Sequence, residues 1–218
     1  VKAYVFGDDL NRATSWHLLD ILKRHQIEVF SLAADVEAGQ TKFKKDQSFI
    51  VPLDQAQYTT IKAIFSTQTK FRDSLFYDIS AWTFPLAFNL PYAELKSAGK
   101  LLGRKIDKAV MPSGKLVGGH SGYAYLFEWN EFYAPRLLNQ LLKAGIRAKV
   151  AQRPFSVKTG EGTRDFGYGT ILVPVSGQPV SADSLCNLVS AAAGMDATDV
   201  YAAGTGMTGG INLGSSNF

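Results

Sequence analysis

The feature that most constrains the fold is an internal repeat. Residues 3–53 run from an apolar segment, AYVF, through an amphipathic segment to a further apolar segment that contains Val51-Pro52. Residues 124–175 repeat this order, from AYLF to Val173-Pro174, and matching residues lie 119 to 122 positions apart. Because loop insertions of a few residues explain that drift, we interpret the chain as a duplication.

Each copy alternates strand-like segments with amphipathic helical segments, which is typical of βα units. We therefore expect an α/β fold with two duplicated flavodoxin-like halves, similar to class I glutamine amidotransferases, with mainly parallel sheets and helices on both faces. The expected organisation is a first repeat over 1–95, a connector over 96–121 and a second repeat over 122–218. Strands are expected at 3–6, 27–32, 48–53, 124–127, 145–150 and 170–175, and helices ending near 25, over 56–66, around 137–142 and over 181–194.

The composition is that of an ordinary globular domain, with 46% hydrophobic and 19% charged residues among 218. The net charge of +4 comes from scattered lysines and arginines, so we expect no nucleic-acid partner. No run of 18 apolar residues occurs, which predicts no membrane span. The single cysteine excludes an intrachain disulfide. Because the first residue is Val1, we expect the chain to be part of a longer protein.

An aromatic segment over 71–95 allows two interpretations. It holds seven aromatic residues and two prolines but only four charges. We align it with the glycine-rich segment 199–214, matching Tyr77 with Tyr201, and Asn89-Leu90 with Asn212-Leu213. The bulky copy then fills space that the small copy leaves open. Alternatively, the segment binds a small ligand, glycan or peptide in one open cleft, because aromatic faces stack on ligands; the candidate residues are Tyr77, Asp78, Trp82 and Trp129.

Two short motifs imitate catalytic loops. Gly204, Gly206 and Gly209 fit GxGxxG, but a dinucleotide site also needs a helix that opens at the third glycine and an acidic residue about twenty positions later. Ser121, in GGHSGY, precedes a strand, whereas a nucleophile elbow follows one. We interpret the first as accidental and the second as a connector.

Two further residue sets contain candidate nucleophiles or metal ligands. Cys186 lies inside an amphipathic helix, where a free cysteine is typically a small buried hydrophobe. His25, Glu28 and His120 form a formal set of zinc ligands, but the second repeat has Ala144 and Arg147 at the equivalents of the first two. We therefore predict no catalytic residue, no metal ligand and no cofactor in this chain.

Four strings together resemble a known family: FRDSLFYDISAWTFPLAFNLPYAEL, LLKRHQIEVFSL, SFIVPLDQAQ and GINLGSSNF. They are similar to the region that follows the peptidase domain in large bacterial zinc carboxypeptidases of the carboxypeptidase A type, which carry a glutamine amidotransferase-like domain. The resemblance implies an exported parent hydrolase whose peptidase domain holds the zinc. It also implies that this chain is a non-catalytic accessory or interaction domain with the parent's other domains as partners.

Overall fold

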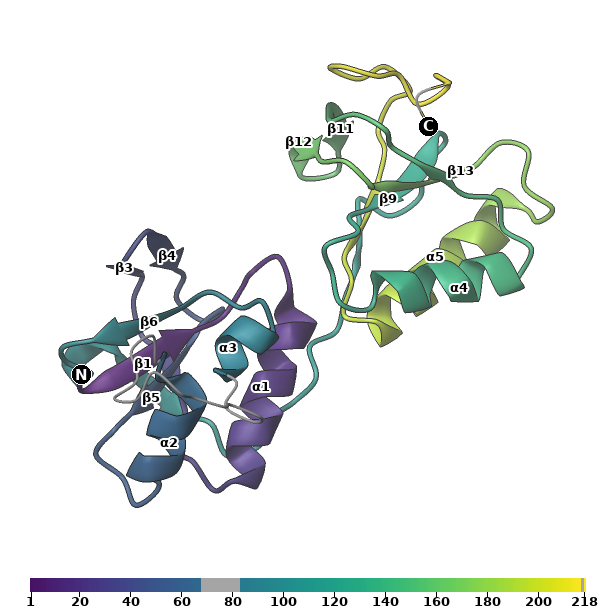
Figure 1. The fold of residues 1–218 in the computed structure, drawn as a ribbon. Helices are drawn as coiled ribbons and strands as arrows, with labels where there is room; N and C mark the ends of the chain where they lie inside the picture. The colour runs from purple at the N-terminus through teal and green to yellow at the C-terminus, as the bar shows by residue number, and fades with distance from the viewer. Residues whose placement is uncertain (68–82, 217) are drawn as a thin grey trace, which may run out of the picture. The chain divides into compact units, whose positions relative to one another are not determined.

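The computed structural model describes residues 1–67, 83–216 and 218. The chain forms two compact units, Val1–Met111 (unit 1) and Pro112–Phe218 (unit 2) (Figure 1). The predicted connector, residues 96–121, contains the secondary-structure elements η1, β7 and β8.

Unit 1 is built on a five-stranded sheet with the order β6-β1-β5-β2-β7, in which every pair is antiparallel. A separate hairpin, β3 and β4, follows β2. The elements in chain order are β1 (Ala3–Phe6), α1 (Arg12–Arg24), β2 (Phe30–Leu32), β3 (Val36–Ala38), β4 (Thr41–Phe43), β5 (Phe49–Pro52), α2 (Tyr58–Phe65), α3 (Phe84–Ala87), β6 (Tyr92–Leu95), the 3₁₀ turn η1 (Gly99–Leu101) and β7 (Leu102–Lys105).

Unit 2 contains a five-stranded sheet with the order β10-β13-β9-β14-β8. Its pairs are antiparallel, except that β8 runs parallel to β14. The elements are β8 (Leu116–Val117), β9 (Ala124–Phe127), α4 (Ala134–Lys143), β10 (Lys149–Val150), the hairpin strands β11 (Phe155–Thr159) and β12 (Gly162–Phe166), β13 (Ile171–Pro174), α5 (Ala182–Met195) and β14 (Val200–Ala202).

The two units have the same topology. The strand order β6-β1-β5-β2 in unit 1 corresponds to β14-β9-β13-β10 in unit 2. The register agrees as well, because Tyr4 lies opposite Val51 and Tyr125 lies opposite Val173. In each unit the first two strands of the repeat run parallel, and a third strand lies between them and antiparallel to both. This is the split βαβ arrangement of ferredoxin-like folds.

The predicted flavodoxin-like architecture, similar to class I glutamine amidotransferases, is therefore wrong. The sheets are largely antiparallel because β5 and β13 insert between strands that a flavodoxin-like fold would pair directly. The predicted helices on both faces are also wrong. Each unit carries its two long helices on one face of the sheet and a β-hairpin on the other (Figure 1).

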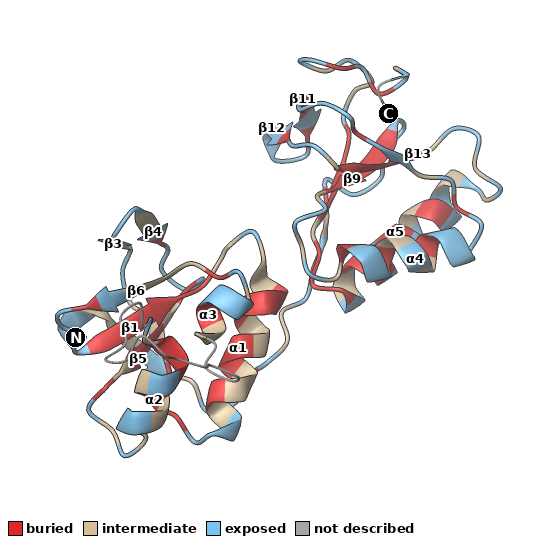
Figure 2. Cartoon of the chain, viewed as in Figure 1, coloured by how far each residue is buried: buried red, intermediate tan, exposed pale blue. Residues whose placement is uncertain are grey.

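The buried core of each unit accordingly has two layers, one on each face of its sheet. In β1, Tyr4 and Phe6 pack with the helices, whereas Ala3 and Val5 pack with the hairpin side. In β9 the same alternation divides the residues between the helix layer and the layer that contains the β11–β12 hairpin. Both strands are fully buried as a result (Figure 2). Alternation along a strand explains why one strand contributes to both layers.

The first helix of each unit ends in the same Schellman motif. In unit 1, Gln26 has a φ of 59° and donates its N–H to Lys23 O at 3.0 Å, and Ile27 donates to Leu22 O at 3.0 Å. In unit 2 the equivalent left-handed residue is Gly145, with a φ of 77°. Ile146 then donates to Leu141 O at 3.0 Å. Glutamine thus occupies in unit 1 a conformation that favours glycine.

Replacing Gln26 with glycine should stabilise unit 1 by about 0.5 to 1 kcal/mol. Glycine removes the conformational strain of a left-handed residue, which stabilises the folded state. This gain in free energy exceeds the loss from the greater backbone entropy of glycine in the unfolded chain. Chemical denaturation of the purified variant measures the change. The matched control is Gly145→Ala, which should destabilise unit 2 by about 1 kcal/mol. A Gln26→Gly variant that is less stable than the parent would contradict this account of the helix end.

Candidate functional site

The residues predicted to line an aromatic cleft are only partly described. Tyr77, Asp78 and Trp82 lie outside the described residues. Trp129 follows β9 and is 44% exposed, and its Cβ would lie 3.6 Å from a Cβ placed on Gly169. Phe132 and Tyr168 are also exposed. Because Phe127 pairs with Ile171, the segments that carry these three aromatic residues leave the sheet at the same end.

The proposed match between the aromatic and glycine-rich segments is wrong. Tyr201 lies opposite Leu126 in unit 2, and the register of unit 1 gives Ala93 the equivalent position, opposite Val5. The counterpart of β14 is therefore β6, and Tyr77 is not the counterpart of Tyr201. Asn89-Leu90 precedes β6, whereas Asn212-Leu213 follows β14, so this pair does not match either.

The formal zinc ligands have other contacts. His25 is the C-cap of α1. The Glu28 carboxylate forms an ion pair with Lys105. The exposed His120 places its Nε2 3.2 Å from Asp183 Oδ1. Among the residues that the structure describes, no group of three or more His, Cys, Asp or Glu side chains could hold a metal ion.

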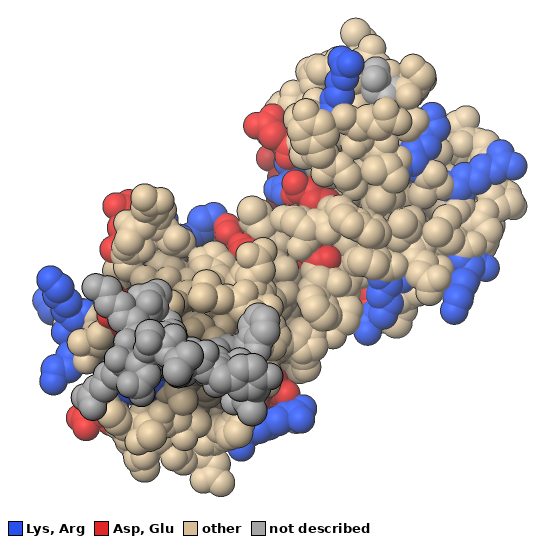
Figure 3. Space-filling model, in the orientation of Figure 1, with Lys and Arg blue, Asp and Glu red and all other residues tan. Residues whose placement is uncertain are grey.

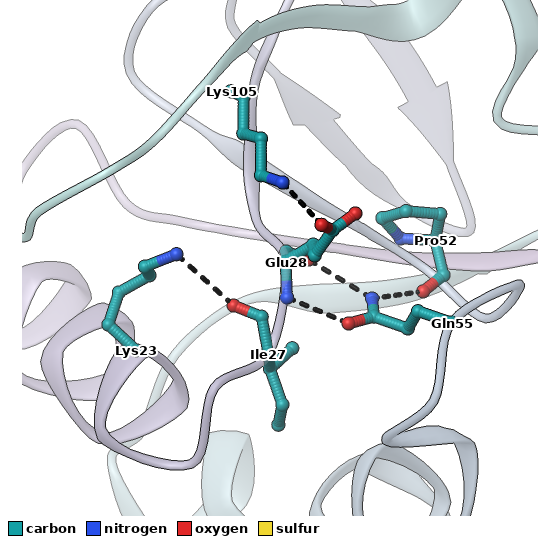
Figure 4. A network of polar contacts seen from close by, with 6 residues as sticks. All are labelled: Lys23, Ile27, Glu28, Pro52, Gln55 and Lys105. Carbon is teal, nitrogen blue, oxygen red and sulfur yellow. Dashed lines mark hydrogen bonds and ion pairs between the residues drawn. The ribbon is translucent and has the colours of Figure 1, made fainter.

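The polar network around Glu28 is centred on Gln55 (Figure 4). Gln55 Oε1 accepts the Glu28 N–H at 2.7 Å, and Gln55 Nε2 donates to Glu28 O at 3.1 Å and to Pro52 O at 2.7 Å. The amide thus joins the end of β5 to the segment that leads into β2. Lys23 Nζ donates to Ile27 O at 3.4 Å beside it.

The same amide clamp occurs in unit 2. Gln178 Oε1 accepts the Arg147 N–H at 2.8 Å, and its Nε2 donates to Arg147 O at 2.8 Å and to Pro174 O at 2.7 Å. Glu28 and Arg147 have opposite charges, yet both enter the clamp through their backbone. The clamp is therefore a structural element of the repeat and places no demand on the side chain it holds.

The two motifs that resemble functional loops, around Ser121 and around Gly204–Gly209, also have structural roles. Ser121 is buried, and its Oγ donates to Ala203 O at 2.7 Å while accepting the N–H of Tyr123 and Ala124. Gly204 donates its N–H to Lys158 O at 2.7 Å. Gly209 exchanges two 2.8 Å backbone hydrogen bonds with Ser156. The glycine-rich segment therefore runs beside the β11–β12 hairpin, and a Cβ on Gly209 would lie 2.5 Å from Ser156 Oγ.

Cys186 of α5 is partly buried and packs against the helix-side core. The Tyr125 hydroxyl accepts the N–H of Ser121 at 3.2 Å. Burial raises the pKa of Tyr125 to about 12. Cys186 thus packs as a small hydrophobic side chain of the core, which is a structural role.

The equivalent tyrosine of unit 1, Tyr4, has charged neighbours instead. Its hydroxyl accepts a hydrogen bond from Lys62 Nζ at 3.0 Å, lies 3.3 Å from Ser66 Oγ and is 3.5 Å from Glu94 Oε1. The hydrogen bond to Tyr4 raises the pKa of Lys62. The ring of Tyr4 stacks on Phe65, with centroids 4.8 Å apart. We call Tyr4, Lys62, Ser66 and Glu94 the Tyr4 cluster.

The Tyr4 cluster is the candidate site that the structure supports best. The tyrosine itself belongs to the repeat, but Glu94 has Ala202 as its counterpart in unit 2. A lysine, a carboxylate and two hydroxyls can donate to and accept from a polar ligand or a peptide backbone. Glu94 is exposed and Lys62 and Ser66 are partly exposed, so the cluster lies at the surface beside β6. Motif reading missed it because its residues are spread from position 4 to position 94.

The charged side chains are dispersed on the face of the molecule drawn in Figure 3. Lysine, arginine and acidic side chains lie interspersed with uncharged surface on this face. Within the described part of the chain, none of the helices is long and apolar enough to cross a membrane. The chain matches no protein-family model, no curated protein and no solved structure.

Proposed function

We propose that this chain is a non-catalytic accessory or interaction domain of a zinc metallocarboxypeptidase-like protein. The observation that supports it most directly is that the candidate catalytic residues take part in contacts that stabilise the fold. Ser121 Oγ donates to the backbone of Ala203, and Cys186 packs against the helix-side core of unit 2. The backbone of Glu28 is held by an amide clamp that recurs in unit 2. The class of the parent protein, and its export, follow from the resemblance of four strings in this chain to large bacterial zinc carboxypeptidases.

The second candidate is a small-ligand or glycan-binding module. The observation that favours it is the group of exposed aromatic side chains Trp129, Phe132 and Tyr168. Exposed aromatic faces stack on sugar rings and on peptide side chains. A tryptophan with 44% exposure would report such binding by a change in its fluorescence.

The test uses the purified chain together with the zinc peptidase domain that the parent's reading frame is expected to encode. We expect the chain to co-elute with that domain in size-exclusion chromatography and to hydrolyse no C-terminal peptide substrate by itself, with or without added zinc. Turnover by the chain alone would contradict the proposal. Independent elution, combined with a fluorescence change on titration with oligosaccharides that Trp129→Ala abolishes, would favour the second candidate.

A further inference from the structure

The two sheets differ in how their equivalent edges are covered. In unit 2 the outer edge of β14 is paired with β8, which runs parallel to it. In unit 1 the corresponding strand, β6, is the last strand of its sheet. The fifth strand of unit 1, β7, lies at the opposite edge, beside β2. Among the residues that the structure describes, no strand pairs with the outer edge of β6, where unit 2 has an additional strand.

The backbone groups available at the β6 edge follow from its pairing with β1. Gly7 donates its N–H to Pro91 O at 3.2 Å. Alternation in an antiparallel pair then directs the hydrogen-bonding groups of Ala93 toward β1 and those of Tyr92 and Glu94 outward. Within residues 1–67, 83–216 and 218, no strand pairs with these outward groups.

Unit 2 shows what such an edge accepts. Ala203 donates its N–H to Ala124 O at 2.9 Å, so Val200 and Ala202 are the outward residues of β14. Val200 in turn donates its N–H to Lys115 O at 2.9 Å, at the start of β8. The registers opposite Tyr125 and Tyr4 make Ala202 equivalent to Glu94, and hence Val200 equivalent to Tyr92.

Burial agrees with this comparison. Val200, Tyr201 and Ala202 are all buried beside β8. Their equivalents in β6 are more exposed: Tyr92 and Ala93 are only partly buried and Glu94 is exposed. An exposed edge is a template for strand addition, which proteins use to recognise extended peptides.

We propose that the β6 edge binds an extended peptide segment of a partner polypeptide, running parallel to β6 as β8 runs along β14. This inference deepens the proposed function, on which it rests, because it assigns the interaction surface. The bound segment carries two consecutive aliphatic residues, as Leu116 and Val117 do in β8. The first lies beside Tyr92 on the helix side of the sheet, and the second lies beside Ala93 on the hairpin side.

The residue that follows these two in the bound segment should be small. In unit 2 the residue after β8 is Gly118, and a Cβ on it would lie 3.0 Å from Gly160 N in the β11–β12 turn and 3.3 Å from Ala202 Cβ. Its counterpart in the bound segment lies beside Glu94, at the border of the Tyr4 cluster. The cluster thus borders the proposed peptide site on its helix side.

The experiment measures amide hydrogen exchange by NMR in the 218-residue chain. Without a ligand, we expect the Tyr92 and Glu94 amides to exchange at least about 100-fold faster than those of Val200 and Ala202. A blocked synthetic peptide with the sequence of residues 114–119, GKLVGG, should then slow exchange at Tyr92 and Glu94 about tenfold or more at millimolar concentration. The same peptide with prolines in place of leucine and valine should have no effect.

Two variants at one position separate backbone from side-chain effects. Glu94→Pro removes the outward N–H of an edge strand, where proline is tolerated, and should abolish the protection at Tyr92. Glu94→Ala keeps that N–H and should retain it. Should Glu94→Pro fail to fold, the proline-containing peptide on the unmodified chain provides the same contrast.

The outcomes distinguish this inference from the proposed function. Lack of protection by GKLVGG, or equal protection by both peptides, overturns the inference and leaves co-elution with the peptidase domain unaffected. Protection that rises with protein concentration alone, together with elution as a dimer, assigns the edge to a second copy of the chain and also overturns it. Peptide hydrolysis by the chain overturns the proposed function without changing the exchange at β6.

Discussion

Replacing Arg136 with leucine should lower the free energy of unfolding of unit 2 by about 3 kcal/mol or more. The Asp196 side chain is completely buried at the end of α5. Arg136 Nε donates to Asp196 Oδ1, and Gln140 Nε2 donates to Asp196 Oδ2 at 2.9 Å. Without the guanidinium, Gln140 is the one side-chain donor to this buried carboxylate among the described residues, and it is neutral. Urea denaturation followed by the NMR signals of β9 measures the loss.

The control for this prediction removes the buried charge as well. Arg136→Leu combined with Asp196→Asn should recover more than half of the lost stability, because a neutral amide costs less to bury than an unpaired carboxylate. The guanidinium carbon of Arg136 also lies 3.9 Å from the Tyr133 ring centroid, so the double variant should remain less stable than the parent. A single variant that loses under 1 kcal/mol would show that the ion pair does not hold α4 to α5.

The expected strands overlap β1, β2, β5, β9, β10 and β13, and the expected helices overlap α1, α2, α4 and α5. The two hairpins and the direction of the strands were not predicted. AYVF and AYLF are continuous apolar runs, which are typical of strands buried on both faces of a parallel sheet. In this fold the second face is buried by a hairpin, so the same pattern arises in an antiparallel sheet. The sequence contained a signal for those hairpins. Residues 36–43 and 155–166 each alternate around a glycine-containing turn.

The candidate site was less predictable than the fold. No short motif connects Tyr4 with Lys62 and Glu94. The pairing of β1 with β6 brings Glu94 to Tyr4, and Lys62 reaches the same hydroxyl from α2. The repeat offered a better signal than any motif. When the two units are aligned by strand register, Glu94 in unit 1 corresponds to the uncharged Ala202 in unit 2. Such differences in charge identify candidate site residues. Matching Tyr77 with Tyr201 cannot give this register. The match assumes similar spacing after the second helix of each unit, but more residues separate α2 from β6 than separate α5 from β14.

Removing either amide clamp is expected to cause a large loss of stability. Gln55→Ala and Gln178→Ala should each destabilise their own unit by about 3 kcal/mol. Each substitution removes three hydrogen bonds, worth about 1 kcal/mol apiece, and leaves backbone groups at the start of β2 or β10 without a partner. Hydrogen exchange at the β1 and β9 amides reports the stability of each unit separately.

Glutamate at the same positions is the matched control, because it keeps the acceptor oxygen and the shape of the side chain but removes both N–H donors. Gln55→Glu and Gln178→Glu should therefore be destabilising at neutral pH, where the carboxylate faces the carbonyl oxygens of Pro52 and Pro174. They should regain stability as the pH falls and the carboxyl is protonated, since it can then donate one hydrogen bond. Effects that differ by more than about 2 kcal/mol between the units would contradict an equal structural role for the two clamps.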